Sequence, residues 1–176
     1  MTGYPAKSEL GNKAVFDLTM QATSGYMHIT GEPDGAPTKV GYAVTDVLTG
    51  QHLTTGILAA CMQRERTSRP GFKGDGQHVT TSMLESALYS LSYVTSSYLN
   101  GDFDYGRTGN RHSLIAPYSV YKTGDAKWIV LGVATDKQFE TLKKIIKLED
   151  PQNLFVSNST RLENREALDN KINLAF

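Results

Sequence analysis

The sequence is poor in several features that would assign it to a functional class. It has one cysteine, Cys61, so the chain cannot form an internal disulfide. This fits a reducing intracellular compartment, the cytoplasm or the mitochondrial matrix. No apolar run reaches the length of a transmembrane helix, which argues against insertion into a membrane. The N-terminal residues lack the charged start and apolar centre of a secretory signal.

An excess of charge of either sign is also missing. Lys and Arg total 18, and Asp and Glu total 18, giving a formal net charge of zero. Such a balance argues against binding to nucleic acid or to an anionic membrane surface, because both need a strong basic footprint. It leaves room for a small anionic ligand, which needs only a local basic group.

Several common site motifs are absent. The four histidines show no spacing typical of paired metal ligands, so we expect no metal site. No Gly-x-Ser-x-Gly elbow occurs, which disfavours a serine hydrolase. The glycine-rich stretch 71–76 lacks the strand-then-helix context and the Gly-Lys-Ser/Thr ending of a phosphate loop.

What the sequence has is enough apolar content, 39%, to form a packed core. Periodicity and breakers predict helices and strands in sequence order. The expected helices cover 14–24, 46–63, 82–98, 136–146 and 161–174, with Ser82 as a cap. The expected strands are short stretches at 40–43 and 77–81 and a β-hairpin formed by 118–122 and 128–133.

A polar loop at 100–113 separates two kinds of pattern. We therefore expect two parts, residues 1–105 and residues 106–176. The fold class expected is α/β, although too few strands are visible for a complete sheet. The start within a loop and the abrupt ending at Phe176 suggest a piece of a longer polypeptide.

Asp46 is the first candidate for chemistry. It is a single carboxylate in a largely apolar neighbourhood, where the 46–63 helix is expected to begin. One interpretation is an N-cap that accepts backbone N–H bonds. The other is a nucleophilic carboxylate that forms an acyl anhydride and then a thioester. Both roles are compatible with the spacing.

Two further positions allow a structural role beside a functional one. His112 lies in the loop Gly109-Asn110-Arg111-His112, and it is either a site member or a surface histidine. Cys61 follows the apolar run 57–60 and is interpreted as a small buried hydrophobe rather than a nucleophile.

A set of motifs then resembles the class III CoA-transferases, the CaiB/BaiF or formyl-CoA-transferase-like family. The motifs occur in the family's order, and together they cover the chain from about Gly3 to its end. They are 24–37 (SGYMHITGEPDGAP), Val44-Thr45-Asp46 with Thr49-Gly50 and 56–60, Gly76-Gln77 with 82–88, 109–112, 116–118, 136–139, and Asn158, Arg161, Asn164, Arg165 and Leu168.

The resemblance implies part of a Rossmann-like large domain, residues 1–105, followed by the start of a smaller α+β domain, residues 106–176. It also implies an interlocked homodimer when the protein is full length. The reaction implied transfers CoA from an acyl-CoA to a carboxylate, with coenzyme A present only as part of the substrate and with no metal. Asp46 matches the family's nucleophile, which passes through an anhydride and an aspartyl-CoA thioester.

The resemblance extends to binding residues. Lys13, Ala14, Val15 and Phe16 match a stretch that lies along CoA, where Lys13 could face a phosphate. Independently of the resemblance, we take Arg111 and His112 as candidates for contact with the carboxylate of the acceptor. The α-methylacyl-CoA racemases of this family have a histidine at the position of Phe16. Since Phe cannot move a proton, the sequence favours a transferase, of the succinyl-CoA:glutarate kind, over a racemase.

Three departures from the family pattern are evident. The family's chains are more than twice as long, residues 67–75 are an extension, and Thr80 stands where Asp is common. Two alternatives to a transferase remain. One is a truncated chain that has no catalytic activity and offers only an interaction surface. The other is a racemase-like enzyme.

Overall fold

The computed structural model describes residues 1–101 and 103–176. The chain divides into two units, residues 1–107 and residues 108–176. The expected boundary lay at residues 105 and 106, within the same loop. Each unit is described by itself.

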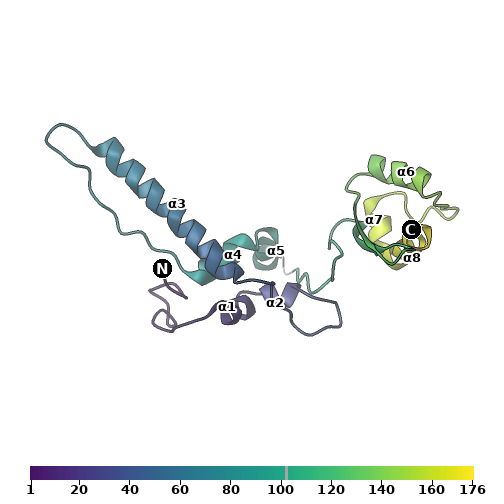
Figure 1. The fold of residues 1–176 in the computed structure, drawn as a ribbon, viewed down its shortest axis with the longest axis horizontal. Coiled ribbons are helices and arrows are strands. Elements are labelled where there is room, and N and C mark those ends of the chain that lie inside the picture. Colours follow the sequence, from purple (N-terminus) through teal and green to yellow (C-terminus); the bar gives the residue numbers. More distant parts are fainter. Residues whose placement is uncertain (102) are drawn as a thin grey trace. The chain divides into compact units, whose positions relative to one another are not determined.

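The described residues of the first unit form helices joined by loops, and the long α3 (Val44–Thr67) extends away from the others (Figure 1). The helices are α1 (Asp17–Thr23), α2 (Tyr26–Ile29), α3 (Val44–Thr67), α4 (Met83–Ser90) and α5 (Tyr93–Gly101). Helices α1, α3 and α4 contact one another. The core comprises Tyr4, Met20, Met83 and Ala87, with Val15, Tyr26 and Leu84 packed against it.

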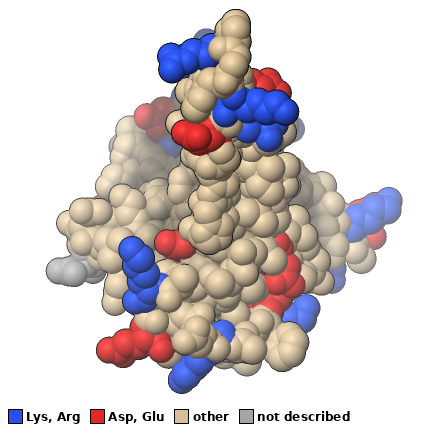
Figure 2. Space-filling view, turned by 90° about the vertical axis from the view of Figure 1, so that its left-hand side faces the viewer, with Lys and Arg blue, Asp and Glu red and all other residues tan. Residues whose placement is uncertain are grey.

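Helix α3 is longer than the sequence predicted. It begins at Val44 rather than Asp46, and it continues to Thr67 where a loop was expected from residue 64. Residues 62–66, Met-Gln-Arg-Glu-Arg, are all good helix formers, which explains the extension. Arg64, Glu65 and Arg66 lie near its far end, where side chains of both charges gather in Figure 2.

The helix expected over 82–98 is divided in two. Ser82 caps α4 as predicted: its Oγ accepts from the Glu85 N–H at 3.3 Å, and the Glu85 carboxylate accepts from the Ser82 N–H at 3.2 Å. This reciprocal arrangement is a capping box. The break follows at Leu91 and Ser92, where Ser92 has φ 50° and lies in the left-handed region. A residue in that conformation cannot continue a right-handed helix.

The two short strands expected in the first unit are not present in its described residues. Gly41 and Tyr42 form a bend within residues 40–43, and residues 77–81 have no regular structure; neither segment joins a sheet, and only isolated bridges occur, Thr2 with Ser82 and Arg69 with Phe72. The backbone N–H of Val40 donates to the Gln21 side chain rather than to a neighbouring strand. Extended segments become strands only where another segment supplies a hydrogen-bonding edge, so residues 1–101 and 103–107 carry no Rossmann-like sheet.

The second unit contains the predicted β-hairpin. Strands β1 (Tyr118–Lys122) and β2 (Trp128–Gly132) pair antiparallel, with Tyr118 opposite Gly132 and Lys122 opposite Trp128. Helix α6 (Asp136–Ile145) follows as predicted. The helix expected over 161–174 is two helices, α7 (Asn158–Glu163) and α8 (Arg165–Ala175), because Asn164 leaves helical geometry.

A second apolar core holds this unit together. Its buried members are Ala116, Tyr121, Val133, Phe139, Leu142, Phe155, Leu168 and Ile172. Arg161 is also fully buried among these elements. Its guanidinium donates to the Ala116 and Phe155 carbonyls at 2.7 and 3.2 Å and to the Asp136 carboxylate at 2.7 Å. A buried charge requires such partners, so Arg161 connects α7 to α6 and to the segment that leads into β1.

Two features are absent from the described residues. In residues 1–101 and 103–176, no helix is both long enough and apolar enough to pass through a bilayer. Over the same ranges, no three His, Cys, Asp or Glu side chains lie together where they could hold a metal ion.

Candidate active site

Asp46 lies in the first turn of α3, as the third residue of the helix. Its side chain is exposed, and among the described residues no hydrogen bond or ion pair engages its carboxylate. The N-cap position belongs to Ala43, whose side chain cannot cap. The N-cap interpretation of Asp46 is therefore wrong, and the positive end of the helix dipole stabilises a carboxylate that remains accessible.

Asp17, the first residue of α1, occupies the position from which a cap would act. One oxygen of its carboxylate, Oδ1, accepts from the backbone N–H of Thr45 at 2.9 Å and from the Thr45 hydroxyl at 2.7 Å. A neighbouring helix thus supplies the acceptor that α3 lacks at its own N-cap. This frees the Asp46 carboxylate from capping its own helix.

Gln21, one turn further along α1, completes this arrangement. Its Nε2 donates to Asp17 Oδ2 at 2.6 Å and more weakly to the Tyr42 carbonyl at 3.4 Å. Its Oε1 accepts from the Val40 N–H at 2.8 Å. Since Gln21 is fully buried, its amide connects Asp17 rigidly to the segment that leads into α3.

The hydrogen bonds set the charge state of Asp17. Burial alone raises the pKa of its carboxyl. The hydrogen bonds from the Thr45 hydroxyl, from Gln21 and from the backbone N–H groups of Thr45 and Asp46 outweigh burial and lower the pKa below 3.8. Asp17 is therefore a carboxylate at neutral pH.

Residues 13–16 lie directly before α1. Val15 is half-buried and packs on the first core, whereas Lys13, Ala14 and Phe16 are exposed. Gly3 makes this packing possible, because a Cβ at Gly3 would overlap Val15 Cγ1. One inward side chain thus anchors the stretch, and Lys13, Ala14 and Phe16 remain accessible to a ligand.

Arg111 and His112 belong to the second unit, whereas Asp46 and residues 13–16 belong to the first. Arg111 Nε pairs with Asp169 Oδ2 at 2.9 Å. His112 Nδ1 accepts from the Leu114 N–H at 3.0 Å, and its ring lies against Tyr118. Both side chains are held by neighbours within their own unit, and both remain partly exposed.

Asp169 also accepts from the Tyr121 hydroxyl at 2.7 Å. Burial, followed by this hydrogen bond to a carboxylate, raises the pKa of Tyr121 well above its usual range. Tyr121 and Asp169 therefore form a buried polar pair, which holds Arg111 at the edge of the second unit.

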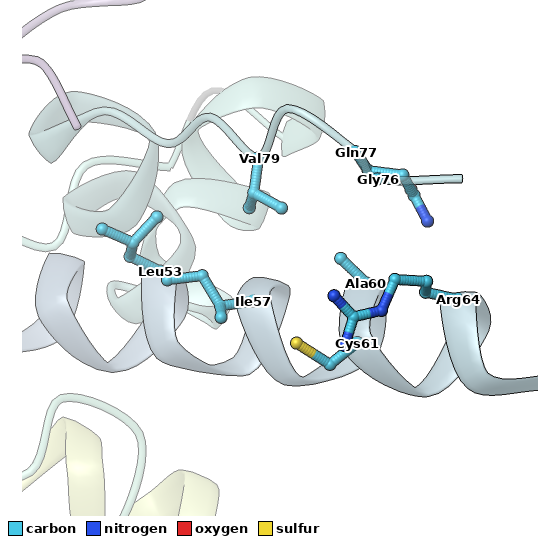
Figure 3. Close-up of a pocket in the computed structure, with 8 residues that line it drawn as sticks. All are labelled: Leu53, Ile57, Ala60, Cys61, Arg64, Gly76, Gln77 and Val79. Carbon is cyan, nitrogen blue, oxygen red and sulfur yellow. The ribbon is translucent and has the colours of Figure 1, made fainter. Parts of the chain in front are cut away.

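A separate cavity of about 280 Å³ lies further along α3, between the helix and residues 76–79 (Figure 3). Leu53, Ile57 and Cys61 line it from the helix, and Val79 faces them. Cys61, expected to be buried, is partly exposed at this cavity. Asp46 does not line it, so the cavity is not the site of the candidate nucleophile.

Comparison with known proteins identifies the family of this chain. The model of the CoA-transferase family III matches residues 1–176. The chain belongs to CoA-transferase family III. The resemblance inferred from the motifs is thereby confirmed.

Curated relatives within the family carry transferase names. The chain is 34% identical over 170 residues to the human succinyl-CoA:glutarate CoA-transferase. The aligned region covers 96% of this chain and 37% of the human protein. It is 36% identical over 146 residues to the succinate--glutarate CoA-transferase of Agrobacterium fabrum, covering 83% of this chain and 35% of the relative. The chain thus spans less than half the length of these relatives.

Solved structures share the fold. A CAIB/BAIF family protein from Brucella suis matches with a TM-score of 0.77 and 30% identity, over 99% of this chain and 45% of that one. A hypothetical protein from Mycobacterium tuberculosis matches with a TM-score of 0.79 and 23% identity. The match covers 99% of this chain and 44% of the Mycobacterium tuberculosis chain. The mixed arrangement of helices and a small antiparallel sheet is therefore that of the CaiB/BaiF fold.

Sequence reasoning missed Asp17. It singled out residues 13–16 and stopped one residue short of the carboxylate that caps α3. The available signal was an acidic residue at the start of a predicted helix, a position at which Asp usually serves its own helix. The sequence separation of 28 between Asp17 and Thr45 hides the contact from any local pattern.

Proposed function

We propose that this chain carries the nucleophile of a CoA-transferase that moves CoA from a dicarboxylyl-CoA, such as succinyl-CoA, to a carboxylic acid acceptor. The observation that carries the proposal is the Asp46 carboxylate. It is exposed and unpaired among the described residues, at the start of a long helix, in a chain that belongs to CoA-transferase family III.

The proposed chemistry begins with attack of an Asp46 carboxylate oxygen on the thioester carbon of the donor. The C–S bond breaks, CoA leaves as a thiolate, and Asp46 becomes a mixed anhydride with the donor acyl group. The thiolate then attacks the Asp46 carbonyl carbon, releasing the donor acid as a carboxylate and leaving an aspartyl-CoA thioester.

The second half of the cycle repeats these steps with the acceptor. The acceptor carboxylate attacks the aspartyl thioester, which expels the thiolate and forms a new anhydride. Attack of the thiolate on the acceptor carbonyl gives the product thioester and restores the Asp46 carboxylate. Every bond formed replaces one that breaks, so no metal or redox step is needed.

Substrate contacts are assigned by charge and accessibility. Lys13 is exposed in the stretch matched to CoA, and a phosphate of CoA would offset its charge. Arg111 is partly exposed while its Nε is held by Asp169, so its other guanidinium N–H groups could receive an acceptor carboxylate. The names of the relatives favour a dicarboxylate acceptor such as glutarate.

We also propose that the full-length protein forms a homodimer, as the family resemblance implies.

The test uses the protein expressed from its complete coding sequence. After incubation with succinyl-CoA, mass spectrometry of the wild-type protein should show an adduct with the mass of CoA, less water, on the peptide that contains Asp46. Asp46→Ala should lose the adduct and all CoA exchange between succinate and glutarate.

Asp75→Ala is the matched control, because Asp75 is exposed in a loop of the same unit and lies outside the candidate site. It should retain both adduct and exchange. Full turnover by Asp46→Ala would refute the proposal. So would exchange of the α-proton of a branched acyl-CoA without CoA transfer, which identifies a racemase.

A further inference from the structure

Asp17 lies where it can control the geometry of Asp46 without touching the substrate. Its carboxylate receives two hydrogen bonds from Thr45, the residue that directly precedes Asp46. Thr45 is fully buried, and its carbonyl accepts from the Thr49 hydroxyl one turn later. The backbone on the N-terminal side of Asp46 is therefore fixed by side chains as well as by the helix.

The same carboxylate belongs to the element that follows residues 13–16. Asp17 begins α1 immediately after Phe16, which is 82% exposed. A shift of α1 would therefore move the stretch matched to CoA and the first turn of α3 together. Since a reacting group must lie within a fraction of an ångström of its productive position, this connection bears directly on rate.

We propose that Asp17 is a positioning residue: held by Gln21, it fixes the first turn of α3 so that the Asp46 carboxylate stays free and aligned with the thioester lying along residues 13–16. This inference rests on the proposed function of Asp46. Asp17 acts through Thr45 and takes no part in bond making.

In this network, each polar side-chain atom of Asp17 and Gln21 can act only as a donor or only as an acceptor. Substitutions that exchange donors and acceptors therefore test the proposal directly. Gln21 Nε2 must donate to Asp17, because Gln21 Oε1 is engaged by the Val40 N–H. Asp17→Asn would set an amide NH₂ against the Gln21 NH₂, and the Gln21 amide could turn only by losing its bonds to Val40 and Tyr42. Adding Gln21→Glu supplies a carboxylate that accepts from the new amide and from the Val40 N–H. It restores these two contacts with the same net charge and gives up only the weak bond to the Tyr42 carbonyl.

The experiment measures the single-turnover rate of CoA adduct formation on Asp46, in the protein expressed from its complete coding sequence, with succinyl-CoA as the probe. Asp17→Asn should lower this rate and kcat by about 10- to 100-fold, because small misplacements of a reacting group cost that much. Gln21→Glu, which sets two carboxylates together, should also lower it. The double variant D17N/Q21E should recover most of the loss.

Controls separate positioning from folding and from the proposed function. Asp75→Asn, in an exposed loop, should leave the rate unchanged. If Asp17→Asn does not fold, Thr45→Val removes one donor while keeping the shape of the side chain. It should lower the rate about fivefold, the equivalent of one hydrogen bond.

Two results would overturn the inference: folded D17N or T45V reacting at the wild-type rate, or losses in D17N and Q21E that add in the double variant. A wild-type protein that forms no adduct on Asp46 refutes the proposed function instead. A purely structural role for Asp17 would lower the melting temperature of the variants without changing the adduct rate of the folded protein.

Discussion

The Asp17 carboxylate accepts both the backbone N–H and the hydroxyl of Thr45, at 2.9 and 2.7 Å. Helix α3 is therefore capped by a residue from α1, while the acidic residue in its own first turn, Asp46, remains exposed. Capping of α3 and the proposed nucleophilic attack, which the sequence could have assigned to one carboxylate, then belong to two different residues. A carboxylate already engaged by backbone N–H groups is a weaker nucleophile, so the division favours reactivity at Asp46.

The lowered pKa of Asp17 predicts how stability depends on pH. The folded carboxyl binds its proton less readily than the unfolded one, whose pKa is near 3.8. The stabilisation from its hydrogen bonds is therefore complete above about pH 5, and it is lost as pH falls through 3.8 toward the lower folded value. Asp17→Asn lacks this dependence.

The measurement is urea unfolding of wild-type protein and Asp17→Asn between about pH 3 and pH 8. The difference in unfolding free energy should be constant above about pH 5 and shrink below about pH 4. A difference that grows on acidification would contradict the hydrogen-bond network. Asp75→Asn provides the baseline for loss of an exposed carboxylate.

Arg161 should be critical for the second unit. Replacement by Met keeps an apolar side chain of similar length but leaves the buried Ala116 and Phe155 carbonyls without donors. We expect a loss of about 2–4 kcal/mol in unfolding free energy. Lys144→Met, at an exposed position on α6, should change it by less than about 0.5 kcal/mol.

Hydrogen exchange should locate the effect of Arg161→Met. Protection should fall in peptides from α6, from α7 and from the segment around Ala116 that leads into β1, because the guanidinium connects these three parts. Unchanged stability would show that α7 is held by its apolar residues alone.

Local elements were predictable where the signal was short-range. The hairpin follows from alternation around the turn 123–126, and the α4 capping box follows from Ser82 and Glu85, three residues apart. Asp46 was found because it occurs within a family motif. These features depend on neighbours in sequence, which a pattern can read.

Long-range features were not predictable from the same patterns. The burial of Arg161 depends on carbonyls 45 and 6 residues away, and the cap on Thr45 comes from 28 residues earlier. The break at Ser92 replaces one expected helix by two through a residue in the left-handed region, which helix propensity does not predict.

Tyr121 and Asp169 provide a test of the second unit's polar core. Tyr121→Phe removes the hydroxyl that donates to the buried Asp169 carboxylate and leaves only Arg111 as its partner among the described residues. We expect a loss of about 1–3 kcal/mol in unfolding free energy, measured by chemical denaturation. Tyr118→Phe, on the same strand with an exposed side chain, is the control and should be near neutral.

The capping box of α4 gives a smaller effect. Ser82→Ala removes the acceptor for the Glu85 N–H, and it should cost about 1 kcal/mol. Ser82→Asn should retain most of the stability, because Asn is an equally good N-cap and its NH₂ can still donate to the Glu85 carboxylate, as the Ser82 hydroxyl does. Ser96→Ala, at an exposed position inside α5, controls for loss of a hydroxyl. Equal stability of the Ala and Asn variants at position 82 would argue against the cap.

The contact between Gly3 and Val15 predicts an effect on substrate binding. In Gly3→Ala, the new Cβ would overlap Val15 Cγ1 and lie 3.1 Å from Val15 Cβ, so residues 13–16 must move outward. Overpacking of this kind costs about 1–3 kcal/mol in stability. Because Lys13 and Phe16 flank Val15, KM for the acyl-CoA should rise while KM for the acceptor acid stays unchanged.

The double variant Gly3→Ala/Val15→Ala decides whether the contact is the cause. Shortening Val15 makes room for the new methyl group, so the loss in stability should be smaller than the sum of the two single losses. KM for the acyl-CoA should return toward the wild-type value. Strict additivity, or an equal rise in both KM values, would show that Gly3 acts on the whole unit rather than on the 13–16 stretch.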